Sequence, residues 1–296
     1  MSKTLSTISR LKVVLVVFAA LLFLPSIAVR AQGINWEGQT GAFVTPFAYT
    51  SPSEKNKFGK PQISFHYLNA GSVVGNHYQA SITVGAAKRV EFGYTRNFSS
   101  PGKTAVSPLF DNGFNIIHGK VNLVEENAGK TKWVPAISAG FVARTNVKRV
   151  GGVINNKSET NGDIYVVATK TVTQVKDLPL LFNFGVKYTN ASIMGVAGNS
   201  PDWKPTVFAA VAAVVKGPSK STLIFGSEVA QQPKYIKGLP GPTVPPTLTY
   251  FVRILPKAEV PLALDFGVAQ VAGRITPGVD LKARHQFAMG ISYAFK

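Results

Sequence analysis

Twelve stretches with alternating apolar and polar or small residues dominate the sequence from residue 61 onward. Each is bounded by Gly, Pro, Asn, Asp or Lys, and alternation at every second residue is typical of a β-strand, whose successive side chains point to opposite faces. The expected strands are 61–69, 77–86, 89–98, 113–124, 134–145, 162–173, 180–189, 204–215, 220–229, 247–255, 261–270 and 284–295. The pattern predicts an all-β protein.

The clearest strands carry one strongly apolar face. Stretch 180–189 places Phe182, Phe184, Val186 and Tyr188 on one face and Asn183, Gly185 and Lys187 on the other. The stretches 113–124, 162–173 and 204–215 alternate poorly, so the pattern assigns their faces only loosely.

Alternation by itself is shared by soluble β-sandwiches and membrane β-barrels. Here the apolar faces are rich in aromatic residues near the strand ends, and the opposite faces are rich in Gly, Ala and Ser. A sandwich usually presents more Lys and Glu on its outer faces. The sequence therefore favours an antiparallel transmembrane β-barrel.

The first 31 residues have the pattern of an export signal. Lys3, Arg10 and Lys12 precede the uncharged run 13–24, and small or short residues end at Ala31. The run is too short for a transmembrane helix, which needs about 20 apolar residues, so a retained anchor is the weaker alternative. We expect cleavage near Ala31. The leader holds four basic and no acidic residues, so the net charge falls from +18 to +14.

Short and long connections alternate between the expected strands from residue 113 onward, as they do in outer-membrane barrels. The long final connection, 271–283, requires an even number of strands if the chain ends in the periplasm. Twelve strands satisfy this condition. The Pro-rich stretch 238–246 is unsuited to pairing and is expected outside.

Residues 41–49 also look strand-like, but they would make a thirteenth strand. Either they belong to an N-terminal segment, 32–60, that lies in or under the lumen as a plug, or they are one of two further strands in a fourteen-stranded barrel. The expected organisation is a leader at 1–31, this segment at 32–60 and a barrel at 61–296.

Two features resemble known bacterial proteins. The closing segment Phe287–Phe295 resembles the C-terminal signature of Gram-negative outer-membrane barrels, which the barrel-assembly machinery reads, although this chain ends in Lys296. The stretches Glu37–Pro46 and Trp133–Pro135 resemble uncharacterised outer-membrane barrel proteins of unknown function. The resemblance implies a location, an architecture and the assembly machinery as a partner, with no site residues to transfer.

Charged residues on the expected inward faces are the first candidate site. The basic candidates are Arg144, Lys187, Arg253, Lys120 and Lys170, and the acidic candidates are Glu91, Glu228 and Asp265. In a water-filled lumen a basic excess favours anions. Alternatively, the charges pair and fill a closed barrel, because a buried charge needs a partner.

Glycines recur on the inward face of seven strands, at Gly85, Gly93, Gly140, Gly185, Gly226, Gly267 and Gly290. Such glycines relieve the strain of closing a small barrel. They also let a plug or ligand approach the wall.

Enzymatic chemistry has little support. The chain has no cysteine, and His66, His77, His118 and His285 lack metal-ligand spacing, so we expect no metal and no cofactor. His66 and His77 are expected to flank one outer loop, where a hydrolase would use such a histidine.

Basic residues in the connections indicate surface partners: Lys55, Lys57, Lys60, Lys148, Arg149, Lys157, Lys234, Lys237, Arg274, Lys282 and Arg284. These suit lipopolysaccharide phosphates or acidic sugars, and export argues against nucleic acid.

The resulting hypothesis is a porin-like channel or transport component of the bacterial outer membrane, leaning towards anionic solutes and surrounded by lipid and lipopolysaccharide. The alternative is a closed structural barrel that binds envelope polysaccharide or lipopolysaccharide. An outer-membrane hydrolase comes third.

Overall fold

A computed structural model describes residues 33–111, 113–147, 160–174, 178–233, 244–257, 259–276 and 279–295. The wall strands are β1 (Gln62–Asn69), β2 (Asn76–Ala86), β3 (Val90–Ser100), β4 (Asn115–Val124), β5 (Ala136–Thr145), β6 (Asn161–Val172), β7 (Leu180–Ala191), β8 (Asn199–Lys216), β9 (Thr222–Ala230), β10 (Thr247–Leu255), β11 (Leu262–Gln270) and β14 (Gln286–Ala294). A hairpin outside the wall comprises β12 (Ala272–Thr276) and β13 (Val279–Ala283). The short helical elements are α2 (Gly71–Val74), η2 (Ser107–Phe110), η3 (Ala128–Lys130), η4 (Ser192–Gly195) and η5 (Pro218–Lys220).

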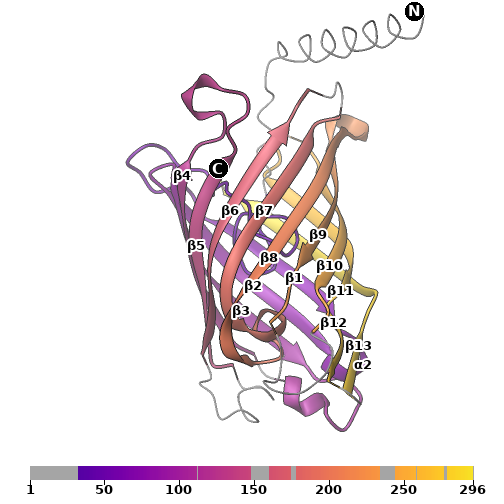
Figure 1. Ribbon diagram of the computed structural model, residues 1–296. Coiled ribbons are helices and arrows are strands. Elements are labelled where there is room, and N and C mark those ends of the chain that lie inside the picture. The colour runs from indigo at the N-terminus through magenta and orange to yellow at the C-terminus, as the bar shows by residue number, and fades with distance from the viewer. Residues whose placement is uncertain are drawn as a thin grey trace, which may run out of the picture.

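Twelve antiparallel strands close into one barrel (Figure 1). Each strand pairs with its neighbours along the chain, with β11 joined directly to β14. The barrel closes where β1 pairs with β14, for example Phe65 opposite Ile291. The predicted twelve-stranded barrel is confirmed, and the fourteen-stranded alternative is wrong.

Two wall details differ from the prediction. Strand β8 begins at Asn199, earlier than expected, because Ala191 of β7 still pairs with Asn199 beyond a register shift. The predicted loop 271–283 contains the hairpin β12–β13, in which Arg274 lies opposite Asp280. This hairpin extends the chain beyond the wall between β11 and β14 (Figure 1).

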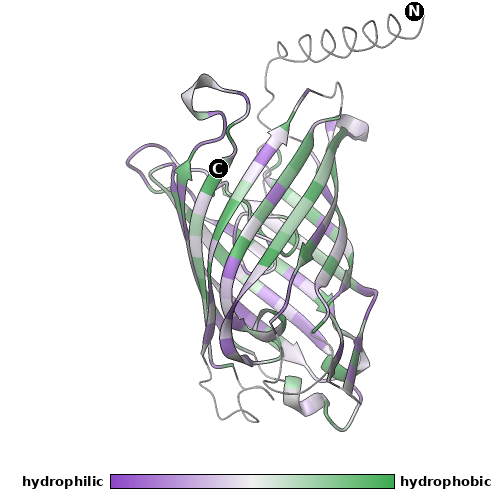
Figure 2. Ribbon diagram, viewed as in Figure 1, coloured by the Kyte–Doolittle hydropathy of each residue, from purple (hydrophilic) through white to green (hydrophobic). Residues whose placement is uncertain are grey.

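Hydrophobic and hydrophilic residues alternate along the wall strands (Figure 2), and the outward side chains are largely apolar. Along β7, Phe184 and Tyr188 are 56% and 50% exposed, while the residues that follow each of them, Gly185 and Thr189, are buried. The same alternation leaves apolar side chains outward on every wall strand, including Phe92, Ile164, Tyr250 and Phe287. Exposed apolar area on this scale is unfavourable in water and favourable in a bilayer, so the barrel is a transmembrane one.

The inner face explains the weak alternation of three strands. Ile116 of β4, Tyr165 of β6 and Phe208 of β8 point inward and belong to the same apolar cluster as Trp36 and Phe43. Both faces of these strands are therefore apolar at several positions, because one meets lipid and the other meets a segment inside the barrel.

That segment consists of residues 33–51 and is called the inner segment here. It makes two isolated bridges with itself, Ile34 to Thr40 and Gly41 to Pro46, rather than joining the wall. Trp36 and Phe43 are each 1% exposed. In Figure 1 the coil enclosed by the strands belongs to this early part of the chain.

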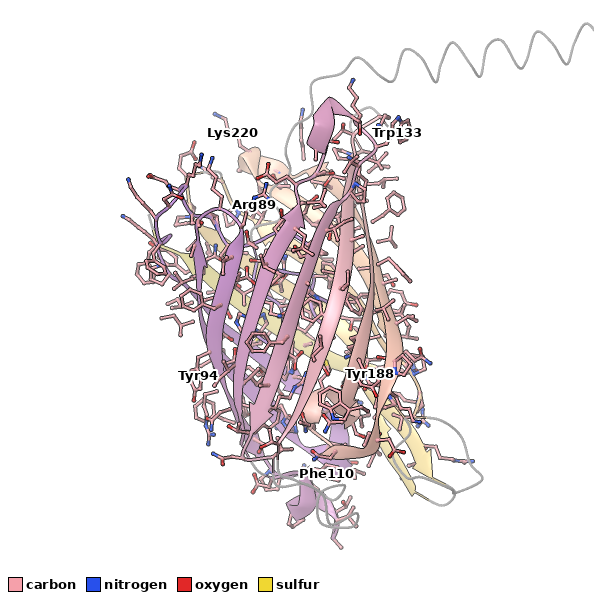
Figure 3. All side chains as sticks on the ribbon, turned by 60° about the vertical axis from the view of Figure 1, so that its left-hand side comes forward. Arg89, Tyr94, Phe110, Trp133, Tyr188 and Lys220 are labelled. Atoms are coloured by element: carbon pink, nitrogen blue, oxygen red, sulfur yellow. The ribbon has the colours of Figure 1, made fainter. Side chains whose placement is uncertain are left out.

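The two ends of the barrel carry different connections. Figure 3 places Arg89, Trp133 and Lys220, from three connections, at one end and Phe110 at the other. Among the described residues, no helix combines the length and hydropathy needed to cross a bilayer.

Several predictions fall outside the described residues. These are the leader at 1–31, most of the Pro-rich stretch 238–246, and the loop residues Lys148, Arg149, Lys157, Lys234 and Lys237.

Candidate functional site in the occupied lumen

The inner segment folds into a compact double turn through its own hydrogen bonds. Asn35 Oδ1 accepts the N–H groups of Glu37 at 3.0 Å and Gln39 at 2.8 Å, a local turn that Asn side chains favour. Gly38 has φ +92°, and a Cβ there would collide with the Thr95 hydroxyl and press on His118 of the wall. A second turn follows, in which Phe47 N donates to Thr40 O at 3.0 Å. The turns leave many main-chain groups of residues 37–48 directed at the wall.

One anchor is the pair Glu91 on β3 and Lys120 on β4, whose charged atoms lie 3.1 Å apart with both side chains fully buried. The Glu91 carboxylate accepts from Thr40 N at 3.0 Å and from Ser51 N at 2.7 Å. Lys120 Nζ donates to Thr40 O and Phe47 O, both at 3.0 Å. The pair therefore holds both ends of the second turn.

A second anchor grips the middle of that turn from another part of the wall. Glu228 of β9 accepts from Val44 N at 2.7 Å, Thr45 N at 2.8 Å and the Thr45 hydroxyl at 2.8 Å. Carboxylates that accept several N–H groups form strong, charge-assisted hydrogen bonds.

Arg253 of β10 holds the carbonyl side of the turn. Its guanidinium donates to Gly41 O at 2.8 Å and Ala42 O at 3.0 Å, while Nε lies 2.7 Å from Asp265 of β11. Asp265 compensates the buried positive charge and orients the fork towards the two carbonyls.

A third anchor joins the inner segment to β5. Arg144 Nε and Nη2 lie 2.7 and 2.5 Å from Glu37 Oε1, and Nη2 lies 2.8 Å from Asp163 of β6. Lys187 Nζ lies 3.7 Å from the same Asp163. One arginine therefore connects the segment to two acidic groups within a buried network.

Neutral side chains complete the contacts around residues 46–49. Asn183 donates to Pro46 O at 3.1 Å, Thr169 accepts from Ala48 N at 2.7 Å, and Asn122 and Ser138 both donate to Ala48 O. The Tyr49 hydroxyl donates to Glu126 at 2.8 Å, in the connection between β4 and β5.

Lys170 is misplaced in the sequence prediction. Its neighbours on β6 show that Tyr165, Val167 and Thr169 point inward, so Lys170 points outward. Its Nζ lies 3.1 Å from Glu126 and 2.6 Å from Asn127, at the rim of the wall. The poor alternation of stretch 162–173 caused the error, since the inward residues of β6 are as apolar as the outward ones.

The structure places Arg144, Lys187, Arg253 and Lys120 in the lumen with Glu91, Glu228 and Asp265. Two acidic residues that bind the same basic groups were missed, Glu37 and Asp163. Asp163 occupies an inward position of a weakly alternating strand, and Glu37 lies outside every expected strand. The sequence signal for Glu37 is its position at the start of the stretch Glu37–Pro46, whose family resemblance says nothing about the partner of its charge.

The seven inward glycines mostly face rings. Gly93 lies opposite His118, Gly140 opposite Tyr165, Gly185 opposite Phe208, Gly290 opposite His66, and both Gly226 and Gly267 opposite Phe251. A Cβ at Gly93, Gly140, Gly185, Gly226 or Gly290 would collide with the facing ring. At Gly85 a Cβ would instead collide with the main chain of Ser51. Glycine thus makes room for rings at five positions, for the main chain of Tyr250 at Gly267, and for the inner segment at Gly85.

The histidines lie among aromatic and hydroxyl groups. His66 is fully buried, with its ring 6.2 Å from Trp36 and 5.7 Å from Phe43, both edge-on. His118 Nε2 lies 3.3 Å from the Thr83 hydroxyl. Among the described residues, no group of three His, Cys, Asp or Glu side chains is arranged to hold a metal ion.

A pocket of about 610 Å³ lies against the wall from β6 to β10, lined by inward residues such as Asn183 and Glu228 and by outward ones such as Phe182 and Phe184. The lumen beside the inner segment also contains a small cavity. A cavity of about 20 Å³ lies against Glu37, Gln39, Tyr165 and Lys187. This is room for about one water molecule, whereas ligand pockets usually measure about 300 Å³ or more.

These observations define the class of protein: a twelve-stranded transmembrane β-barrel whose lumen is filled by its own N-terminal segment. The chain belongs to the family described as Protein of unknown function (DUF3034), whose model matches residues 32–264. The match covers the inner segment together with β1 to β10.

Solved barrel structures resemble the chain at low sequence identity. A KdgM porin has 10% identity and a TM-score of 0.46, over 79% of this chain and 99% of that one. A NanC porin has 9% identity and a TM-score of 0.42, over 80% and 99%. An outer membrane channel from Pseudomonas putida F1 has 10% identity and a TM-score of 0.43, over 85% and 100%. No curated protein matches the chain.

Proposed function

We propose that this protein is a channel or transport component of the bacterial outer membrane whose conducting path is closed by the inner segment. The observation that carries the proposal is that wall groups of the lumen bind the segment's main chain. Glu91, Lys120, Glu228 and Arg253 are all used in this way. Glu91 also pairs with Lys120, and Arg253 pairs with Asp265, so these charges are balanced within the wall while their remaining hydrogen-bonding groups bind the segment.

The outer face supports a membrane, and its lipids as partners, as part of this proposal. The apolar band, with Tyr and Trp side chains such as Tyr188 and Trp203 stacked 5.5 Å apart, suits a bilayer and its interfaces. Export by the predicted leader, recognition of Phe287–Phe295 by the assembly machinery, and lipopolysaccharide as a surface partner remain predictions.

The lean towards anionic solutes also remains a prediction, and the buried charges give it little support. Four basic side chains in the lumen, Lys120, Arg144, Lys187 and Arg253, face the four wall acids Glu91, Asp163, Glu228 and Asp265. The inner segment adds Glu37. With this balance, anion preference in an opened barrel would depend on residues outside this set.

The test is the single-channel conductance of the refolded chain without its leader, with the reversal potential measured under a salt gradient. We expect the intact protein to be closed for most of the recording and a chain lacking residues 33–51 to conduct steadily. An anionic solute preference would appear as a reversal potential of the matching sign. The refolded state of both chains is checked by electrophoretic mobility with and without heating.

Silence in both chains, with both barrels folded, would refute the channel. It would favour the closed barrel that binds envelope polysaccharide or lipopolysaccharide. The extensive contacts of the inner segment are the observation in favour of that alternative, because they resemble a permanent filling as much as a gate.

A further inference from the structure

Wall side chains form more hydrogen bonds with the main chain of the inner segment than with its side chains. The main-chain atoms that receive a hydrogen bond from, or donate one to, a wall side chain are Ile34 N, Glu37 O, Gly38 O, Thr40 N and O, Gly41 O, Ala42 O, Val44 N, Thr45 N, Pro46 O, Phe47 O, Ala48 N and O, and Ser51 N. Every residue type offers the carbonyl oxygen, and every type except proline offers the N–H group.

The wall side chains that bind the inner segment are placed to match the donors and acceptors of a peptide main chain. Glu228 accepts two successive N–H groups, at Val44 and Thr45. Arg253 donates to two successive carbonyls, at Gly41 and Ala42. Acceptors thus stand where a peptide chain presents donors, and donors stand where it presents carbonyls.

We infer that the lumen is a binding site for a peptide main chain, which the inner segment fills in cis and which an oligopeptide of another chain occupies when that segment leaves. The inference rests on the proposed function, since it assigns peptides as the ligand class of the same barrel. The wall selects among peptides by their side chains at two places. One is Arg144, which pairs with Glu37 of the inner segment, and the other is the apolar cluster that holds Trp36 and Phe43.

The connection after the inner segment offers a way to test this with the whole chain. Glu54 and Lys57 pair at 2.7 Å with 74% and 70% of their side chains exposed. A protease recognition sequence inserted after Lys55 is cut once the barrel has folded, which leaves the inner segment bound without a covalent connection. The cut fragment is then released in urea that leaves the barrel folded by electrophoretic mobility.

A fluorescent synthetic peptide of residues 33–55 is added after the urea is removed, and binding is followed by anisotropy. We expect it to bind the cut barrel and not the uncut one, where the site is filled. N-methylation of Val44 removes a donor to Glu228 and keeps every side chain, so it should weaken binding at least about tenfold. N-methylation of Phe43, whose N–H meets no wall acceptor among the described residues, is the matched control.

Three results would overturn the inference. These are equal effects of the two N-methylations, failure of the peptide to bind the emptied barrel, and release of the fragment only when the barrel itself unfolds. Conductance of the same samples separates the two proposals. An emptied barrel that conducts but does not bind the peptide would support the channel and refute the peptide site. A barrel that binds the peptide but does not conduct would support the peptide site and refute the channel.

Discussion

The hydroxyl groups of Thr40 and Thr45 provide a quantitative test of how the inner segment is held. Thr40 Oγ1 lies 2.5 Å from Glu91 Oε2, and Thr45 Oγ1 lies 2.8 Å from Glu228 Oε2, all four groups being buried. Replacing both residues with Val keeps their shape and removes one hydrogen bond to each carboxylate. Each carboxylate keeps its main-chain donors, so no acceptor is left unpaired.

The expected loss is about 1.5 kcal/mol for each site, the lower end for hydrogen bonds to charged groups. The two threonines bind different carboxylates, so the losses should add to about 3 kcal/mol. Local opening of the inner segment then becomes roughly 150 times more frequent, because each 1.4 kcal/mol is a tenfold change. The unfolding of the wall itself should change far less.

Amide hydrogen exchange measures this opening directly, since the rate at a protected amide follows the free energy of the opening that exposes it. We expect the exchange rates of Val44 and Thr45 in the double variant to rise by about that factor, while amides of β7 stay protected. Thr131→Val, at an exposed threonine in the connection between β4 and β5, serves as the control. If the double variant exchanged at the control's rate, the carboxylate anchors would not be what holds the segment.

Arg144→Met should destabilise the fold by about 3–5 kcal/mol, because it leaves Glu37 and Asp163 buried with Lys187 as the remaining nearby cation. The control Arg284→Met, at an exposed pair on the hairpin side, should cost under about 1 kcal/mol. Urea midpoints compare the two variants, and similar values would contradict the buried network. Gly185→Ala should lower the free energy of unfolding by about 1–3 kcal/mol by pushing its Cβ into the Phe208 ring. Part of that loss should be recovered when Phe208 is also changed to Leu. Thermal melts that show no coupling between the two changes would refute the close packing of this ring on the glycine. In a conducting form of the barrel, Lys187→Glu should shift the reversal potential towards cation preference, because its side chain lies in the lumen. Lys170→Glu should cause no such shift, because Lys170 lies at the outer rim. Equal shifts would mean that Lys170 also faces the ion path.

The wall was predictable from sequence because a transmembrane strand has to satisfy two different environments on alternate residues. Where the inner environment is polar, as along β7 and β14, the pattern assigned every face. Where the inner segment makes the lumen apolar, as beside Tyr165 and Phe208, the pattern lost its contrast and Lys170 was placed on the wrong side.

The contents of the lumen were less accessible to sequence reasoning. Residues 41–49 look strand-like because Phe43 and Phe47 are apolar and Pro46 ends the run, yet they fold as a turn held by distant wall residues. Such contacts join residues more than a hundred positions apart, as Glu228 and Val44 do, and no local pattern encodes them. The hairpin β12–β13 was missed because five-residue strands are too short for alternation to be counted.

The closing contact of the barrel has a consequence for the order of assembly. The seam of the wall is the pairing of β1 with β14, the first and last strands, so the wall is complete only after the whole chain has been made. The inner segment precedes β1 and is gripped from both flanks of that seam, by Glu91 and Lys120 on one side and by Arg253 and Glu228 on the other. Residues 40–47 of the inner segment therefore connect the two flanks of the seam across the lumen.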